Sequence, residues 1–427
     1  MDPLMAFLRQ PNALPSSGWR QPEFTGWRDE QMSWKTTCSL GDWSFLWDLV
    51  IEGPQALEFL QYYSVNDLVN FEIGRAKHLV QVSERGNIVA EGVVMRLAEN
   101  RYSMQSSPAF YSAYRLSRGD YDVQWHQQDT FQYQVSGPNA LTVCERVTGE
   151  SLTDIKFMRF REVTIAGKRV LALRQGMAGE IGFEFHGAAE DKEAVWDAIL
   201  EAGGPEGIRR IGSRTVMTNH LEAAFPTGNY HYLYDTFDLP GFMDFVMANF
   251  DLDGAPQVRG SLEGDVSAYV QTPYALGWGK QVKFDHEFLG RAALEKVAAN
   301  PGRARVTLEW SDEDIIEVYA SLFQRETEPY DFLEFPNQPT YCVWADRIED
   351  EDGNLIGTST VPGYSIYFRH VLTLSYIDPA FAEPGTPVWI VWGAPGHPQK
   401  RVRATVKPAP YKQDRRRAPL VSAPPSA

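Results

Sequence analysis

The feature that most constrains the fold of this 427-residue chain is a short unit that occurs twice. A strand-like run leads into Gly-Pro-x-Ala-Leu and then into apolar residues at helical spacing, first at residues 53–57 (GPQAL) and again at residues 137–141 (GPNAL). Proline is favoured in the first turn of a helix, so both copies predict a strand followed directly by a helix. Because an internal repeat indicates a repeated structural unit, we expect two lobes of mixed α+β structure.

The remaining pattern predicts hairpins and helices first, and strands alone later. Strands are expected at 78–82, 88–97 and 132–136 and in a hairpin over 161–174, and helices at 54–62, 139–147, 190–201 and 290–299. From residue 303 onward we expect only strands, at 306–310, 341–344, 371–377, 387–391 and 402–406, with a hairpin turn over 351–354 (EDGN). The predicted fold class is α+β, with a C-terminal all-β domain that is barrel- or jelly-roll-like.

Changes in composition suggest where the parts begin and end. We expect an irregular N-terminal arm over 1–34, the two lobes over 35–300, the β domain over 301–412 and a disordered tail over 413–427, where prolines and an Arg-Arg-Arg run are typical of a solvated end. An aromatic-rich insertion at 225–261 is either a lid over a site or a contact in a homodimer.

Charge and cysteine content exclude several classes of protein. Lys and Arg number 40 against 56 Asp and Glu, a net charge of −16, and such an acidic surface repels the phosphates of a nucleic acid. No run approaches the roughly 18 apolar residues of a membrane span. The cysteines, Cys38, Cys144 and Cys342, are far apart and lack metal-ligand spacing, so we expect no metal and a reducing, cytoplasmic location. Aromatic residues make up 13%, which indicates either a pocket for a flat ligand or a large aromatic core.

Short motifs in a fixed order over residues 35–412 resemble the aminomethyltransferase family, that is, the glycine-cleavage T-protein and its folate-dependent demethylase relatives. They are GRAKH at 74–78, RGNIV at 85–89, GEIGFE at 179–184, LEA at 221–223, LGW at 276–278, KFD at 283–285, FLGRAAL at 288–294, GNLIG at 353–357 and GTPV at 385–388. The segment 269–279 (YVQTPYALGWG) is most similar to tetrahydrofolate-dependent O-demethylases of lignin-derived methoxy-aromatics, of vanillate and syringate type. The resemblance implies a T-protein-like fold in which the two lobes are intertwined.

The resemblance also implies a function. We expect a methyltransferase of aromatic catabolism that moves an O-methyl group from a small aromatic substrate to tetrahydrofolate, with no metal, nucleic acid or membrane partner. Such a reaction needs the folate held, the carbon aligned with the accepting nitrogen, and the departing phenolate stabilised. Tyr269 matches the family's catalytic tyrosine and is expected to donate a hydrogen bond or proton to the leaving oxygen. Glu91 stands where T-proteins carry an acidic pair and is the second catalytic candidate.

Four residues are expected to bind the folate. Glu222, in the LEA motif, is the candidate for the pterin, because a carboxylate accepts two hydrogen bonds from an amino group and a ring N–H. Trp278 matches the family's folate-site tryptophan, and Tyr274 and Glu184 are expected in the same pocket. The alternatives are a helix-surface acid for Glu222, core packing for Trp278 and a loop-folding role for Glu184.

The substrate end departs from the family pattern. Trp43 and Phe45 stand where the benzoate demethylases contact the ring, and Ser107 stands where they carry an arginine for the substrate carboxylate. A benzoate would lose its anchor, a charged hydrogen bond of about 1.5–3 kcal/mol. The sequence therefore favours a larger, less charged aromatic substrate.

Other functions remain open at this point. A lyase of the same fold could release formaldehyde from a hydroxymethyl group of an aromatic dimer without folate, with Tyr269 or Glu91 as acid or base. The chain could also demethylate nitrogen or sulfur of a small aliphatic compound. A folate-binding protein that assists iron–sulfur assembly is disfavoured, because its cysteine motif is missing.

Overall fold

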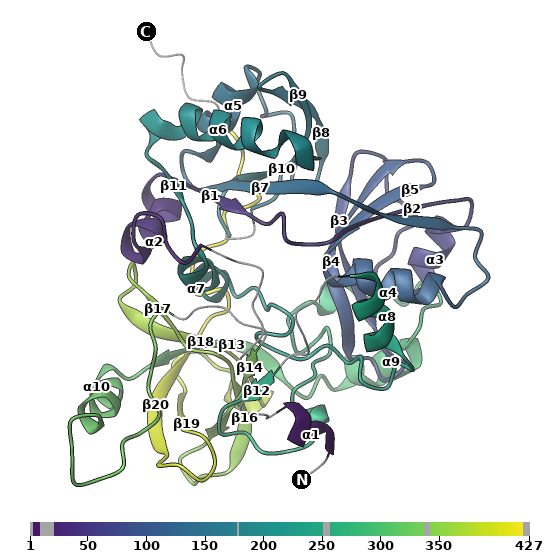
Figure 1. Cartoon of the computed structure of the whole chain (residues 1–427). Helices are drawn as coiled ribbons and strands as arrows, with labels where there is room; N and C mark the ends of the chain where they lie inside the picture. Colours follow the sequence, from purple (N-terminus) through teal and green to yellow (C-terminus); the bar gives the residue numbers. More distant parts are fainter. Residues whose placement is uncertain (1–2, 9–20, 177–178, 251–256, 337–341, 422–427) are drawn as a thin grey trace.

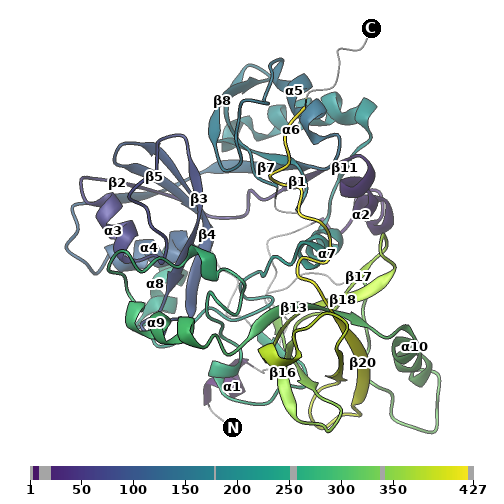
Figure 2. The same ribbon diagram turned by 180° about the vertical axis from the view of Figure 1, so that it is seen from behind.

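The computed structural model describes residues 3–8, 21–176, 179–250, 257–336 and 342–421. Two lobes and a β-barrel are arranged around a common junction (Figure 1), and the view from behind shows the C-terminal segment running from the barrel up to the second lobe (Figure 2). The structure confirms the α+β class with a C-terminal closed barrel.

The first lobe is an antiparallel sheet covered by helices. Its strands run in the order β3 (Ala76–Val82), β4 (Ile88–Ala98), β5 (Arg101–Gln105), β2 (Asp48–Glu52) and β6 (Gln124–Gln128). Its helices are α3 (Ala56–Tyr62), α4 (Ser107–Leu116) and α8 (Phe242–Asn249), of which α4 packs on β4 and on α8. Apolar residues of β2, α3 and β5, such as Leu49, Phe59 and Met104, form its core.

The second lobe is built from one strand that precedes those of the first lobe in the chain and five that follow them. Their order is β11 (Ile208–Arg210), β1 (Cys38–Asp42), β7 (Thr130–Ser136), β10 (Gly182–Ala188), β9 (Lys168–Leu173) and β8 (Phe160–Ile165). The lobe's helices are α2 (Trp27–Thr36), α5 (Ala140–Thr148), α6 (Lys192–Gly203) and α7 (Ser213–Ala223). Because β1 lies here while β2 lies in the first lobe, the two lobes are intertwined, as expected.

The C-terminal domain is a barrel that closes on itself. Its strands follow the order β13 (Ala304–Trp310), β20 (Lys400–Lys407), β19 (Pro387–Trp392), β15 (Asp346–Glu349), β16 (Leu355–Ser359) and β18 (His370–Ile377), and β18 pairs again with β13. β17 (Gly363–Ser365) pairs with β18. The expectation of strands alone from residue 303 was wrong at α10 (Asp312–Ser321), a helix that packs on β20 and whose N-terminus is capped by the Ser311 side chain. The expected strand at 341–344 is β14 (Cys342–Trp344), which pairs outside the barrel with β12 (Gln257–Arg259).

Short elements complete the described chain. They are the helices α1 (Pro3–Leu8) and α9 (Arg291–Ala299) and the 3-10 turns Ala189–Asp191, Gly204–Glu206, Val266–Ala268, Gly279–Gln281 and Pro379–Phe381.

The repeated joint has the same structure in both lobes. Gly53 links β2 to α3 and Gly137 links β7 to α5, and both have positive φ, +157° and +134°. A Cβ on Gly53 would lie 2.3 Å from the Asp122 carbonyl oxygen, and one on Gly137 would lie 2.8 Å from the Thr37 carbonyl oxygen. At these two positions a neighbouring backbone segment leaves no room for a side chain.

Both ends of the chain differ from expectation. The N-terminal arm, expected to be irregular, contains α1 and α2, and Trp34 of α2 is fully buried. The tail, expected to be disordered over 413–427, forms over 413–421 an ordered strap against the second lobe, while 422–427 lie outside the described residues. The Arg415 amide donates to the Gly179 carbonyl at 2.8 Å, and Leu420 packs on the lobe's core.

A buried cation explains why the strap is ordered. Lys412, with 4% of its side chain exposed, has its Nζ 3.8 Å from Glu180 Oε1 and 4.0 Å from Glu222 Oε2. It also donates to Asn219 Oδ1 at 3.3 Å, and its backbone amide donates to the Glu222 carbonyl at 3.1 Å. The composition of the tail is typical of a solvated end, but these partners come from distant parts of the chain.

Replacing Gly137 tests the joint. We expect Gly137→Ala to lower the free energy of unfolding by about 1–3 kcal/mol, because the new Cβ would strike the Thr37 carbonyl and the glycine has positive φ. Gly204→Ala is the matched control, since a Cβ there meets no atom within 4 Å and its φ is −51°. Urea unfolding measures both variants. An equal loss of unfolding free energy in the two would show that the close backbone contact at Gly137 does not require a glycine.

Replacing Lys412 tests the strap. We expect Lys412→Met to destabilise the protein by about 3–5 kcal/mol, because it removes one cation from a buried group of carboxylates. Lys407→Met removes the more exposed pair with Glu309 and should cost less than about 1 kcal/mol. Urea unfolding measures both, and a Lys412→Met variant as stable as Lys407→Met would show that the strap is not held in this way.

Candidate functional site

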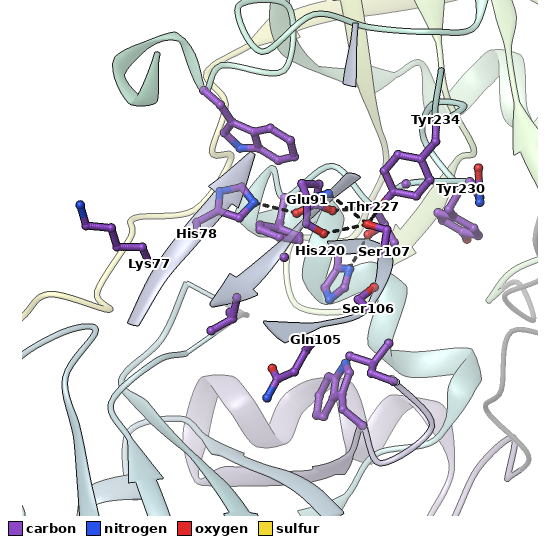
Figure 3. A pocket seen from close by; sticks show the side chains of 18 of the residues that line it. Lys77, His78, Glu91, Gln105, Ser106, Ser107, His220, Thr227, Tyr230 and Tyr234 are labelled. Carbon is purple, nitrogen blue, oxygen red and sulfur yellow. Dashed lines mark hydrogen bonds and ion pairs between the residues drawn. The ribbon is translucent and has the colours of Figure 1, made fainter. Parts of the chain in front are cut away.

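A cavity of about 1440 Å³ lies between the first lobe, the second lobe and the barrel. Its wall combines residues of β3, β4, α4, β7, β10 and α7 with the insertion that follows α7 and with the C-terminal strap. Figure 3 shows part of this wall, with Glu91 near the centre and polar side chains converging on it. Segments far apart in the sequence thus meet around one space.

Glu91 is the centre of the polar cluster. Its Oε2 lies 2.7 Å from His78 Nε2, and its Oε1 accepts a hydrogen bond from the Tyr234 hydroxyl at 3.4 Å. Glu91 on β4 pairs with Val80 on β3, and His78 stands two residues before Val80, so the two side chains share one face of the sheet. The carboxylate is buried, and its neighbours hold it in a fixed orientation.

The hydrogen-bond network fixes which nitrogen of His78 carries a proton. Asn66 donates its amide to Gln281 Oε1 at 3.4 Å, which orients the amide nitrogen of Gln281 toward His78 Nδ1, 3.0 Å away. An amide nitrogen only donates, so Nδ1 accepts and Nε2–H points at Glu91. The Trp278 ring stands edge-on to the imidazole, 4.7 Å between centroids.

Ser107 and Tyr234 form the other side of the cluster. Ser107, the first residue of α4, accepts a hydrogen bond from the Glu91 amide at 3.0 Å, and its Oγ lies 2.9 Å from the Tyr234 hydroxyl. Burial, together with the Glu91 carboxylate, raises the pKa of Tyr234 well above 10. Gly228 lets the ring approach, because a Cβ there would lie 2.0 Å from it. Tyr234 is therefore a neutral phenol beside a carboxylate.

A second polar group links the two lobes across the cavity. Glu184 accepts a hydrogen bond from Gln134 at 3.0 Å, and its other oxygen lies 3.5 Å from His186 Nε2. His186 Nδ1 lies 3.0 Å from the amide nitrogen of Gln105, which comes from the first lobe. Glu184 faces the cavity, as expected from its motif.

Six of the residues singled out from the sequence line the cavity: Glu91, Glu184, Trp278, Trp43, Phe45 and Ser107. Trp43 packs over Gly41, where a Cβ would lie 2.1 Å from the indole ring. Ser107, however, has its hydroxyl engaged with Glu91 and Tyr234, so it supports the polar cluster in addition to lining the wall.

Tyr269 and Tyr274 do not line the cavity. The Tyr269 hydroxyl donates to the Leu262 carbonyl at 2.7 Å, and its ring packs among apolar residues that include Met5 and Leu8 of α1. Tyr274 packs against Gly279, where a Cβ would lie 2.6 Å from its ring. This placement does not support the catalytic role expected for Tyr269 or the folate contact expected for Tyr274.

Glu222 also differs from expectation. Its Oε2 lies 2.7 Å from Lys35 Nζ and accepts from Trp34 Nε1 at 3.3 Å, while its Oε1 accepts from the Ser365 hydroxyl at 2.6 Å. The next residue along α7, Ala223, lines the cavity, whereas Glu222 does not. Because both carboxylate oxygens are engaged inside the protein, the geometry does not support the pterin-binding role.

Sequence reasoning missed His78, Tyr234 and His220, which all line the cavity. His78 lies within the GRAKH motif, and its spacing from Glu91 across a predicted hairpin was the signal that pairs them. Tyr234 follows Tyr230 at four residues in the insertion, and both tyrosines line the cavity. The insertion therefore contributes to the site, which favours the lid of the two roles considered for it.

In the described part of the chain, no group of three or more His, Cys, Asp or Glu side chains could hold a metal ion. None of its helices combines the length and apolar character needed to cross a membrane.

Comparison with known proteins gives a consistent result. Residues 5–233 match the GCVT N-terminal domain family. The chain is 37% identical to a sesamin methylene transferase of Sinomonas sp., covering 93% of this chain and 91% of the relative, and 34% identical to a syringate O-demethylase of Sphingobium sp., covering 94% and 91%. The crystal structure of the glycine cleavage system aminomethyltransferase T from Bartonella henselae superposes with a TM-score of 0.67 at 20% identity, covering 93% of this chain and 96% of that one. The chain belongs to the aminomethyltransferase family and has the fold of its glycine-cleavage T-protein.

Proposed function

We propose that this enzyme removes an O-methyl group from a lignin-derived methoxy-aromatic and transfers it to tetrahydrofolate. The observation that carries the proposal is the neutral Tyr234 phenol beside the Glu91 carboxylate in a cavity walled by Trp43, Phe45 and Trp278. Two relatives that match more than nine-tenths of the chain are named for one-carbon removal from aromatic compounds, syringate and sesamin. The match of 37% and 34% identity supports the same class of reaction here.

The cavity fits a tetrahydrofolate. Gln175 Oε1 and His220 Nε2 are buried and have no hydrogen-bond partner among the described residues, and both residues line the cavity, so they can pair with the polar edge of a pterin. Trp278 and Phe225, with ring centroids 6.2 Å apart, offer aromatic faces. Four cationic residues of the wall can meet the carboxylates of the glutamate tail: Lys77, Lys156, Arg416 and Arg417.

The polar cluster can manage the proton that the reaction moves. Tetrahydrofolate supplies a nitrogen that accepts the methyl carbon and gives up a proton. Breaking the bond between that carbon and the ether oxygen leaves its electron pair on oxygen. As the charge develops there, the Tyr234 hydroxyl donates to that oxygen in place of its hydrogen bond to Glu91. Glu91, held by the Nε2–H of His78, is the base that accepts a proton, and its Oε1 contact with the Tyr234 hydroxyl gives that proton a path to the phenolate. The net result is a phenol and a methylated nitrogen.

A cytoplasmic location is part of the proposal. Cys38, Cys144 and Cys342 are free and buried, which fits a chain that folds without disulfides.

Two tyrosine variants separate the structural assignment from the one based on resemblance. We expect Tyr234→Phe to lower kcat by about 10²-fold or more, because it removes the donor to the leaving oxygen. Tyr269→Phe is the matched control, since its hydroxyl is bonded to the Leu262 carbonyl, and it should keep kcat close to wild type while losing roughly 1 kcal/mol of stability. The reverse result, with Tyr269→Phe inactive and Tyr234→Phe active, would restore the role to Tyr269.

The proposed reaction itself is tested by its products. We expect the protein to convert guaiacol, a one-ring methoxyphenol, to catechol and 5-methyltetrahydrofolate in equal amounts, and to release neither product when tetrahydrofolate is left out. Mass spectrometry follows both products. Formaldehyde released without tetrahydrofolate from a hydroxymethyl-bearing aromatic dimer, with no methyl transfer, would instead support the lyase.

A further inference from the structure

The cavity has an apolar extension beside the polar cluster. We call it the apolar annex and define it by six lining residues: Phe110, Phe237, Leu239, Phe242, Met243 and Val246. The reaction described above does not require these residues, so their presence on the wall calls for another explanation.

The annex adjoins the reacting end because the chain builds both from the same segments. Phe110 stands three residues after Ser107 on α4, so the two side chains lie on one face of the helix. On the other side, the wall follows the chain from Tyr234 through Phe237 to α8. Phe242 of α8 packs edge-on against Tyr114 of α4, with 5.1 Å between the ring centroids. A ligand with its reacting oxygen at Tyr234 would therefore extend into the annex.

The annex offers no cation to a ligand. The described residues that line the annex are uncharged. Among their immediate neighbours on α8, one side chain is charged, that of Asp244, and it is exposed. Two arginines lie close to this stretch of chain, and both are engaged elsewhere. The Arg118 guanidinium lies 4.1 Å from the centroid of the Tyr114 ring and donates to the Pro240 carbonyl at 3.4 Å, and Arg85 is paired with Asp235 and Asp238. A carboxylate placed in the annex would lose water without gaining a partner, which disfavours it.

The size of the cavity agrees with an additional ring. Its volume, about 1440 Å³, exceeds the roughly 300–1,000 Å³ of an ordinary small-molecule site. The wall of the annex is apolar and contains three phenylalanines, which favours a flat, uncharged group.

We propose that the substrate is an uncharged aromatic compound with two rings, whose reacting ring lies at Tyr234 and whose second ring occupies the apolar annex. This inference rests on the proposed function and specifies its substrate class.

Two methionines one turn apart on α8 allow a matched test. Met243 lines the annex with 37% of its surface exposed, whereas Met247, 59% exposed, is outside the wall. The probes are guaiacol and a neutral dimer of two guaiacyl units. We expect wild type to use the dimer with a kcat/KM at least about tenfold higher, because the annex removes the apolar surface of the second ring from water. Met243→Trp should remove that advantage and leave guaiacol turnover unchanged, while Met247→Trp should change neither.

Binding of each probe, measured by quenching of tryptophan fluorescence, decides the inference whether or not turnover occurs. A Kd for the dimer at least about tenfold lower than for guaiacol, lost in Met243→Trp and kept in Met247→Trp, would support the annex as the second-ring site. Equal Kd values for the two probes in wild type, or equal effects of both tryptophan variants, would overturn it. Failure of both probes to form 5-methyltetrahydrofolate, with tight binding of the dimer, would count against the proposed reaction but not against the annex.

Discussion

The buried carboxylate of Glu222 is the constraint on which the rest of the structure depends. With 1% of its side chain exposed, it would cost several kcal/mol if it were unpaired. Its partners come from three other parts of the chain: Lys35 on α2, Ser365 on β17 of the barrel, and Lys412, which directly precedes the strap. Satisfying this one charge therefore brings the second lobe, the barrel and the C-terminal segment together at α7.

That junction also determines the shape of the cavity. Burial lowers the pKa of Lys412 to about 8, because the charged ammonium loses its contact with water. The nearby carboxylates of Glu222 and Glu180 favour the charged form and so offset part of this effect. With Lys412 fixed, the strap carries Asp414, Arg416 and Arg417 into the wall of the cavity. The cationic end of the site thus depends on an ion cluster whose own side chains are not among those that line the cavity.

Local signals in the sequence were enough for much of the fold. The glycine joints, the hairpins and most of the predicted barrel strands each depend on residues a few positions apart, and the structure contains them. The exceptions are β14, which pairs outside the barrel, and α10, a helix where strands alone were expected. Orientation within an element was harder to predict. Successive residues of a helix differ by about 100°, so a motif that places Glu222 and Ala223 on α7 does not say which one faces the cavity. Lys35 and Lys412, which turn Glu222 away, are distant in the sequence.

The same limit applies to the groups that we propose take part in the reaction. Glu91 was found because the family motif and the hairpin both point to it, but its partner Tyr234 lies 143 residues further along the chain, in an insertion with no motif of its own. Tyr269 was the better match by spacing, yet its hydroxyl is bonded to the Leu262 carbonyl. A tertiary contact, and not a local pattern, selects between the two phenols.

The abundant aromatic residues both line the cavity and fill the core. Their placement makes one part of the cavity wall apolar, whereas another part is cationic. Lys77, Lys156 and the strap arginines contribute cations to one part of the wall, whereas Phe237 and Phe242 belong to an annex without cations among its described lining residues. Of the two ligands that we propose, tetrahydrofolate carries carboxylates and a neutral aromatic ether does not, so each would be favoured in a different part of the same space. A carboxylate loses more free energy in the annex than among the cations. The wall therefore disfavours binding in which the carboxylates of tetrahydrofolate lie in the annex and the neutral ether lies among the cations. The polar cluster of Glu91 and Tyr234 adjoins the annex, where a neutral ether would present its oxygen.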